Sequence, residues 1–157
     1  MRNAERKTAQ PFPLTVLEAR VLESADRLVR DTVAATAQLA PQTPPSLGRT
    51  LREAAARAQA AVVDACAERS PRRAVKHVAT CDHGLRRLGT WIDLAERFGD
   101  LPTDAALELL ETQSRLLVGL EELVAGWCCE RGAGAPVPTA EAAWSVIELV
   151  VPDFARS

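Results

Sequence analysis

The residues of this chain that could take part in chemistry are, first, its two histidines and four cysteines. His77 and Cys81 are four residues apart and would share one face of a helix. Cys81 and His83 would point about 200° apart around the same helix, so they cannot bind one ion together. No Cys-x-x-Cys or His-x-x-x-His pair completes a set of ligands. Because Cys81 also falls on an apolar stripe, we expect it to pack in a core, and we predict no metal site.

The remaining cysteines do not indicate a disulfide framework. Cys66 falls on a second apolar stripe, and the neighbours Cys128 and Cys129 are poorly placed to bridge within one helix. We expect one of these neighbours to be buried and the other to be exposed. A small metal-binding or redox-active bundle that uses Cys128 and Cys129 stays open as an alternative.

Motifs for catalysis and phosphate binding are absent from the sequence. Ser, His and Asp residues do not occur at the spacing of a nucleophilic triad. Gly132 and Gly134 lack the preceding strand and the following Lys-Ser/Thr of a phosphate loop. A solvated helix face explains the clustered carboxylates Glu108, Glu111, Glu121 and Glu122. We therefore predict no catalytic residue, no cofactor and no enzyme activity.

Basic residues provide the strongest candidate for a binding surface. Positions 46–99 contain ten Lys and Arg residues against six Asp and Glu residues. Such a patch can bind phosphates by releasing counterions, or it can meet an acidic protein surface. The candidate partner or nucleic-acid surface consists of Arg52, Arg69, Arg72, Arg73, Lys76, Arg86 and Arg87. A solvated, salt-bridged surface is the alternative interpretation, and the scarcity of aromatic residues argues against base stacking.

Three tryptophans are candidate interface residues. Trp91 lies at the edge of an apolar stripe, Trp127 lies near the end of the last long helix, and Trp144 lies in the C-terminal segment. Tryptophan is enriched at protein interfaces. Packing of these side chains within the chain is the alternative.

Four long amphipathic segments must position these residues. Apolar residues recur in each segment at steps of three and four, as on one face of a helix, and the abundant Ala and Leu favour helices. The segments are Leu14 to Leu39, Leu47 to Glu68, Ser70 to Phe98, and Asp104 to Cys128. On the first segment, the expected buried stripe includes Val29, Val33 and Thr36.

Helix boundaries can also be predicted from individual residues. Ser46, Ser70 and Thr103 are expected to be N-caps, because their hydroxyl groups can accept a backbone N–H of the first turn. Pro71 suits the first helical position, where no N–H is needed. Gly99 supplies a left-handed stop at the end of the third segment.

Helices of similar length joined by short loops pack as antiparallel neighbours. We therefore predict an all-α fold, an antiparallel up-down-up-down four-helix bundle. The bundle should span residues 14–129, after a flexible N-terminal arm at 1–13. Residues 130–157 are expected to contain a hinge and a short amphipathic helix, Ala140 to Val151, although Val146 to Val151 could instead form a strand.

The overall charge and the apolar runs bear on location and partners. A net charge of −2 and a pI near 5.7 give no global attraction to nucleic acid. The N-terminus does not resemble a signal peptide, and no run approaches the roughly 20 apolar residues of a membrane span. We expect a cytoplasmic protein that does not bind membranes.

Several short motifs are similar to those of a known family. They are Leu47-Gly48, Leu51-Arg52-Glu53-Ala54-Ala55, Ala61-Val62-Val63-Asp64-Ala65, Arg72-Arg73 and Ala125-Gly126-Trp127. With these motifs the chain resembles the accessory variability determinant proteins of diversity-generating retroelements. It is also similar to the four-helix-bundle proteins encoded in intervening sequences of bacterial ribosomal RNA.

The resemblance implies a bacterial, non-enzymatic accessory protein. Members of this family form homo-oligomers, as pentameric barrels, and associate with a reverse transcriptase and with RNA or DNA through a strongly basic surface. This chain differs from them in its negative net charge and in its segment after Gly132. The alternative function is a protein-only adaptor in a bacterial conflict or signalling system.

Overall fold

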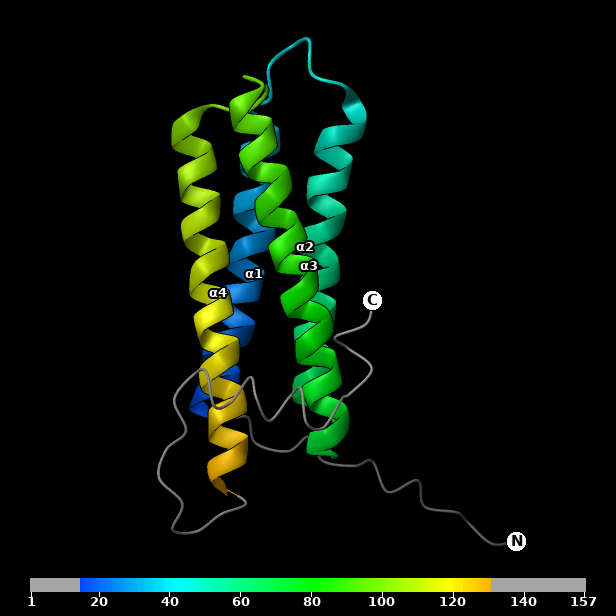
Figure 1. Cartoon of the computed structure of the whole chain (residues 1–157), viewed down its shortest axis with the longest axis vertical. Coiled ribbons are helices and arrows are strands. Elements are labelled where there is room, and N and C mark those ends of the chain that lie inside the picture. The colour runs from blue at the N-terminus through cyan, green and yellow to red at the C-terminus, as the bar shows by residue number, and fades with distance from the viewer. Residues whose placement is uncertain (1–14, 131–157) are drawn as a thin grey trace, which may run out of the picture.

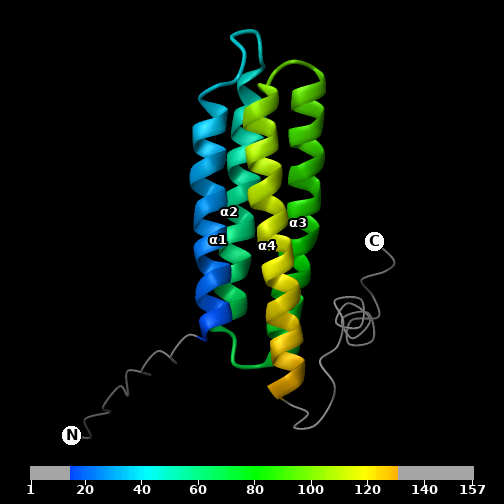
Figure 2. The same ribbon diagram turned by 90° about the vertical axis from the view of Figure 1, so that its left-hand side faces the viewer.

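The protein is an all-α, antiparallel four-helix bundle, as predicted from the sequence. A computed structural model describes residues 15–130, and the side chains of Cys129 and Glu130 lie outside that description. The helices are α1 (Val16–Thr36), α2 (Pro45–Ala67), α3 (Pro71–Arg97) and α4 (Thr103–Glu130). They run alternately up and down (Figures 1 and 2).

The four helices pack as a ring. Each helix packs closely against the two helices beside it, and among the described residues the backbones of the diagonal pairs, α1 with α3 and α2 with α4, do not come close. The α2–α3 pairing is the most extensive and the α3–α4 pairing the least. The buried face of α2 is mostly alanine, and small side chains permit close approach of a neighbouring helix.

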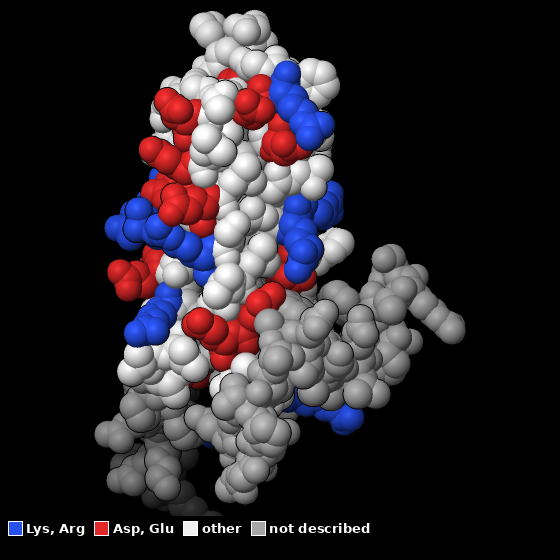
Figure 3. All heavy atoms as spheres, turned by 60° about the vertical axis from the view of Figure 1, so that its left-hand side comes forward, with Lys and Arg blue, Asp and Glu red and all other residues white. Residues whose placement is uncertain are grey.

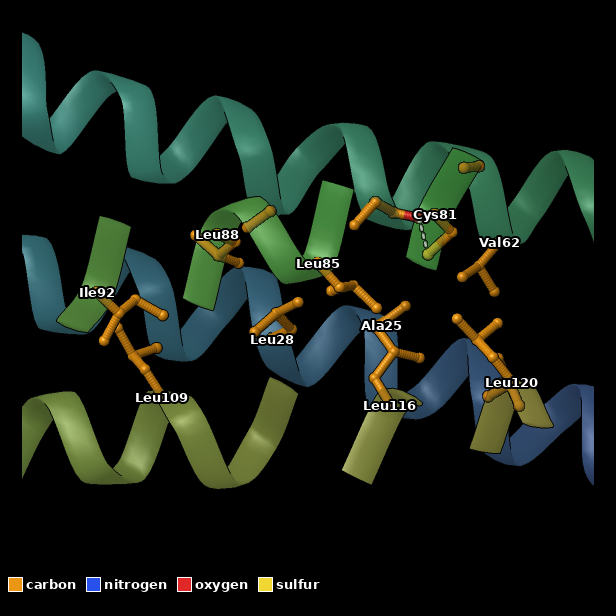
Figure 4. Close-up of a cluster of buried hydrophobic side chains, with 14 of the residues drawn as sticks. Ala25, Leu28, Val62, Cys81, Leu85, Leu88, Ile92, Leu109, Leu116 and Leu120 are labelled. Atoms are coloured by element: carbon orange, nitrogen blue, oxygen red, sulfur yellow. Dashed lines mark hydrogen bonds between the residues drawn. The ribbon is translucent and has the colours of Figure 1, made fainter. Parts of the chain in front are cut away.

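The core lies along the axis of the bundle. Leucine side chains from α1, α3 and α4 point toward one another there, with Val62 contributed by α2 (Figure 4). Fully burying one such side chain is worth about 1.5–3 kcal/mol, so this layer dominates the stability of the bundle. The apolar stripe predicted for α3 is buried at every position: Ala74, Val75, Val78, Cys81, Leu85, Leu88, Ile92 and Ala95.

The stripe predicted for α1 is wrong at one position. Val33 is 51% exposed, whereas Thr32 is completely buried. The Thr32 hydroxyl donates a 2.7 Å hydrogen bond to the carbonyl of Leu28, one turn earlier. Because its polar group is satisfied within the helix, Thr32 can enter the core, and the helical phase then leaves Val33 on the surface.

The helix starts partly differ from the prediction. α2 begins at Pro45 and has Pro44 at its N-cap, so Ser46 is not a cap. Ser70 occupies the N-cap of α3, followed by Pro71 at the first position, yet its side chain makes no capping hydrogen bond. An unpredicted capping box starts α1, where Thr15 and Glu18 each accept from the other's backbone N–H.

The turn after α3 joins two loops at one end of the bundle. Gly99 has a φ of +75°, a left-handed conformation that suits glycine, as predicted. Asp100 follows, and its carbonyl accepts from the N–H of Ala40 at 2.8 Å. The Asp100 carboxylate accepts from the Thr43 hydroxyl at the same distance, 2.8 Å. The α1–α2 and α3–α4 connections are therefore tied together.

Two further sequence predictions bear on this fold. No helix within residues 15–130 is long and apolar enough to cross a membrane. The N-terminal arm predicted at 1–13 and the amphipathic segment that contains Trp144 lie outside the described residues.

Candidate interaction surface

Four cations lie on the side of α3 that faces away from the bundle. Arg72, Arg73, Lys76 and Arg87 are all exposed, and the helical period places them on one side of α3. The set, here named the α3 cationic face, extends about 22 Å along the helix at 1.5 Å per residue. Within residues 15–130, none of the four forms an ion pair.

The carboxylates of α3 lie elsewhere on the helix. Asp82, Asp93 and Glu96 are only partly exposed and all three have partners. Asp82 and Asp93 pair with the arginines four residues later, at 3.0 Å and 3.1 Å. Glu96 accepts a 2.9 Å hydrogen bond from the hydroxyl of Thr103. Since these three are the only carboxylates of α3, the α3 cationic face contains no compensating negative charge.

The remaining predicted cations are placed differently. Arg86 pairs with Asp82, and this hydrogen bond and charge, together with Glu121, raise the pKa of the Arg86 guanidinium. Arg86 therefore belongs to the flank of α3 that faces α4. Arg52 points toward α1, where it donates to the Thr36 hydroxyl at 3.2 Å. Arg69 is exposed in the connection just before α3.

An exposed apolar group continues the outward side of α3 toward its C-terminal end. Trp91 is 39% exposed and Phe98 77% exposed, with Leu94 between them. They border a groove of about 290 Å³, to which Pro44 and Leu47 contribute from the other side. Trp91 was among the predicted interface residues. Leu94 and Phe98 follow Trp91 at steps of three and four, away from the core stripe of α3. This spacing in the sequence could have identified them as members of the same exposed group.

The other predicted aromatic residues do not join this group. Trp127 is partly buried and packs against the core at the end of α4. Trp144 lies outside the described residues.

The described thiols and imidazoles, all within residues 15–128, do not assemble into a site. Cys81 is buried in the core, and its thiol lies 3.4 Å from the Ala58 carbonyl that it donates to (Figure 4). Burial, with a smaller contribution from Asp82, raises the pKa of this thiol to about 12. Burial and the charge of Glu18 raise the pKa of Cys66 to about 11. Neither thiol has a thiolate available near neutral pH.

Metal ligands are also dispersed. Within residues 15–130 there is no group of three His, Cys, Asp or Glu side chains that could hold an ion. His83 is exposed, whereas His77 is partly buried. Cys128 is partly buried, and the side chain of its neighbour Cys129 is outside the description.

A polar contact fixes α4 against α3 beside the candidate surface. The Gln113 amide is buried, and its nitrogen donates a 2.6 Å hydrogen bond to the carbonyl of Leu85. Gly89 makes room for it, because a Cβ there would lie 2.6 Å from the amide nitrogen. Together with the buried apolar stripe of α3, this contact holds α3 in the orientation in which its cations point away from the bundle.

Comparison with known proteins adds no relative. No family model matches the chain, and no curated protein matches it either. The functional argument therefore depends on the α3 cationic face and its surroundings.

Proposed function

We propose that this protein is a non-enzymatic, homo-oligomeric scaffold that recruits an anionic partner through the α3 cationic face. By its resemblance to the accessory variability determinants, the partner is a reverse transcriptase together with RNA or DNA. The bundle supplies a rigid surface, and the chemistry belongs to the partner.

One observation supports this proposal above the others. Five arginines of the described chain are paired with a carboxylate four residues away: Arg27, Arg57, Arg86, Arg97 and Arg115. Surface pairs of this kind are worth little energy but neutralise each other's charge. The α3 cationic face contains no such pair, so its charge is available to a partner.

Phosphate binding by this face would have a measurable salt dependence. If each of the four cations neutralises one phosphate of a single strand, the logarithm of affinity falls by about 2.8 per decade of salt. Between about 50 and 200 mM salt the affinity would then fall about 50-fold.

A protein-only adaptor is the second candidate, and a separate observation favours it. The apolar group of Trp91, Leu94 and Phe98 adjoins the cations, and exposed Trp is typical of the energetic centre of protein interfaces. The net charge of −2 also favours a protein partner over nucleic acid.

Titration of labelled single-stranded RNA distinguishes the two candidates. The first requires binding at about 50 mM salt that weakens about 50-fold at 200 mM. Arg72→Glu combined with Arg87→Glu should remove at least half of the salt dependence. Arg30→Glu combined with Arg49→Glu is the matched control, because it changes the net charge equally on exposed positions of α1 and α2.

The same titration can reject the first candidate. Absence of RNA binding by the unaltered chain at low salt leaves the adaptor as the better account. Equal weakening by both double variants would mean that the overall charge, and not the α3 cationic face, governs binding. Sedimentation of the purified chain tests the oligomeric part of the proposal, which a purely monomeric mass would contradict.

A further inference from the structure

A second groove lies on the opposite side of the ring, between α1 and α4. It has a volume of about 520 Å³. Apolar and small residues that line it include Leu17, Val21, Ser24, Ser114, Val118 and Gly119. Charged residues of both signs, among them Arg20 and Glu122, also line it.

Small residues explain why a groove forms here. A Cβ on Gly119 would lie 3.2 Å from Val21, so the two helices are already close at that level. Beside that contact, the serines leave a hollow that no described side chain fills. Val118 remains 53% exposed next to it. Figure 3 shows the face on which α4 lies, where acidic and basic side chains gather on both sides of an uncharged strip that acidic side chains cross lower down.

The chain itself supplies a segment that matches this groove. Ala140, Trp144, Ile147 and Val151 recur at steps of three and four, which is one stripe of a helix. As a helix, residues 140–151 would be about 18 Å long. The part of α4 that lines the groove, from Glu111 to Glu122, covers the same number of residues and hence the same length.

The connection is also long enough. α4 continues for eight residues beyond Glu122 to its end at Glu130, which is about 12 Å past the groove. The nine residues 131–139 can extend up to about 30 Å. A chain leaving α4 can therefore turn back and bring residue 140 to the near end of the groove.

We infer that residues 140–151 form a fifth helix that docks in the α1–α4 groove of its own chain and covers Val118. The apolar stripe of the segment would pack on the apolar and small lining residues, whereas the charged lining residues carry both signs and do not select an orientation. The α3 cationic face lies on another side of the bundle, so docking leaves it accessible to a partner.

Hydrogen exchange of the full-length chain, followed by mass spectrometry, tests this inference. Amides of residues 140–151 should exchange at least about tenfold more slowly than in an unstructured peptide. Val118→Glu should abolish that protection, because it replaces an apolar residue that lines the groove with a charged one. Leu107→Glu is the matched control, since Leu107 is 60% exposed on α4 but does not line the groove.

Two further measurements complete the test. Trp144→Ala, which changes the docking segment and not the groove, should abolish the same protection. In every variant, the amides of helices α1, α2, α3 and α4 should stay protected, which shows that the bundle is intact. Unprotected amides in the unaltered chain would overturn the inference, as would protection that survives Val118→Glu. Protection that disappears on dilution, together with dissociation in sedimentation, would assign the groove to a second copy and would also overturn it.

Discussion

At the scale of single residues, the contact between Gly89 and Gln113 determines how α3 faces α4. A buried amide needs a hydrogen-bond partner, and the Leu85 carbonyl is available to Gln113 only because position 89 has no side chain. Gly84, five residues earlier on α3, has no heavy atom within 4 Å of the position that an added Cβ would take. Alanine at the two glycines of α3 should therefore change the free energy of unfolding in opposite directions.

Alanine at these positions provides the first prediction. Gly84→Ala should raise the free energy of unfolding by about 0.8 kcal/mol through helix propensity. Gly89→Ala should lower it by about 1 kcal/mol, because an unsatisfied buried amide costs about 1–3 kcal/mol and outweighs that gain. Urea unfolding of both variants measures the difference. Equal stabilisation by the two would contradict the assigned role of Gln113.

The second prediction at this scale concerns which residue of α1 faces the core, Thr32 or Val33. Thr32→Lys should lower the free energy of unfolding by about 3 kcal/mol or more, because it buries a cation in the core. Val33→Lys should change it by less than about 0.5 kcal/mol, as is usual for surface positions. Thermal and urea unfolding compare the two. If Val33→Lys lowered the free energy of unfolding more than Thr32→Lys, Val33 would be the buried residue, as the residue types alone suggest.

The buried thiol of Cys81 provides a prediction of pH dependence. Well below pH 9 the thiol is protonated in the native and the unfolded state, so it contributes no slope. Between pH 9 and about 12 the unfolded thiol ionises while the native thiol keeps its proton. The unfolded state then binds fewer protons, and stability falls as pH rises.

Cys81→Ala should reduce this fall. Unfolding measured below pH 9 and again between pH 9 and 12 should show a smaller loss in the variant than in the unaltered chain. The chain contains no tyrosine, and Cys66, whose pKa is raised to about 11, is present in both proteins, so the difference between them reports on Cys81. Parallel pH profiles for the two proteins would mean that Cys81 is not desolvated in the native state.

At the scale of helices, a residue of the right type at an N-cap position does not always form the capping hydrogen bond. Thr15 and Glu18 satisfy each other's backbone N–H groups at the start of α1. Ser70 has the right residue type and position for α3, but its hydroxyl makes no capping hydrogen bond. Residue type alone therefore overestimates the contribution of Ser70.

This difference leads to a paired prediction. Thr15→Ala should lower the free energy of unfolding by about 1 kcal/mol, the usual value of an N-cap. Ser70→Ala should change it by much less, because no capping bond is lost. Urea unfolding of the two variants provides the measurement, and an equal cost for both would show that Ser70 caps α3 in solution.

The helices themselves could be predicted because each carries a long apolar stripe with the 3.6-residue period. The buried stripe of α3 required only residue types and spacing. The buried side of α1 could not be predicted in this way, because Thr32 is a polar residue. It becomes compatible with the core only through the hydrogen bond to its own helix backbone. Likewise, the groove beside α4 depends on two helices and leaves no signal in either one.

The candidate surface was predictable only in part for a related reason. The spacing of Arg72, Lys76 and Arg87 places them on one side of α3. Whether Arg86 joins them depends on which flank faces α4, and whether Arg52 joins them depends on which side of α2 faces α1. Those directions are set by packing between helices, which a single sequence does not specify.

At the scale of the whole molecule, the net charge of −2 is an average over unlike faces. α4 contains one arginine and several carboxylates, whereas the outward side of α3 contains cations without carboxylates. A partner experiences the local potential of the face that it meets, within a Debye length of about 10 Å. The overall charge therefore does not exclude an anionic partner for α3.

The central claim is that the α3 cationic face is the contact surface for that partner. Photo-crosslinking of the full-length chain to single-stranded RNA containing 4-thiouridine, with the crosslinked peptides mapped by mass spectrometry, tests it most directly. The account predicts crosslinks between Arg69 and Arg87, and their loss in the Arg72→Glu, Arg87→Glu variant. Crosslinks spread evenly over α1 and α2, or none at low salt, would contradict it.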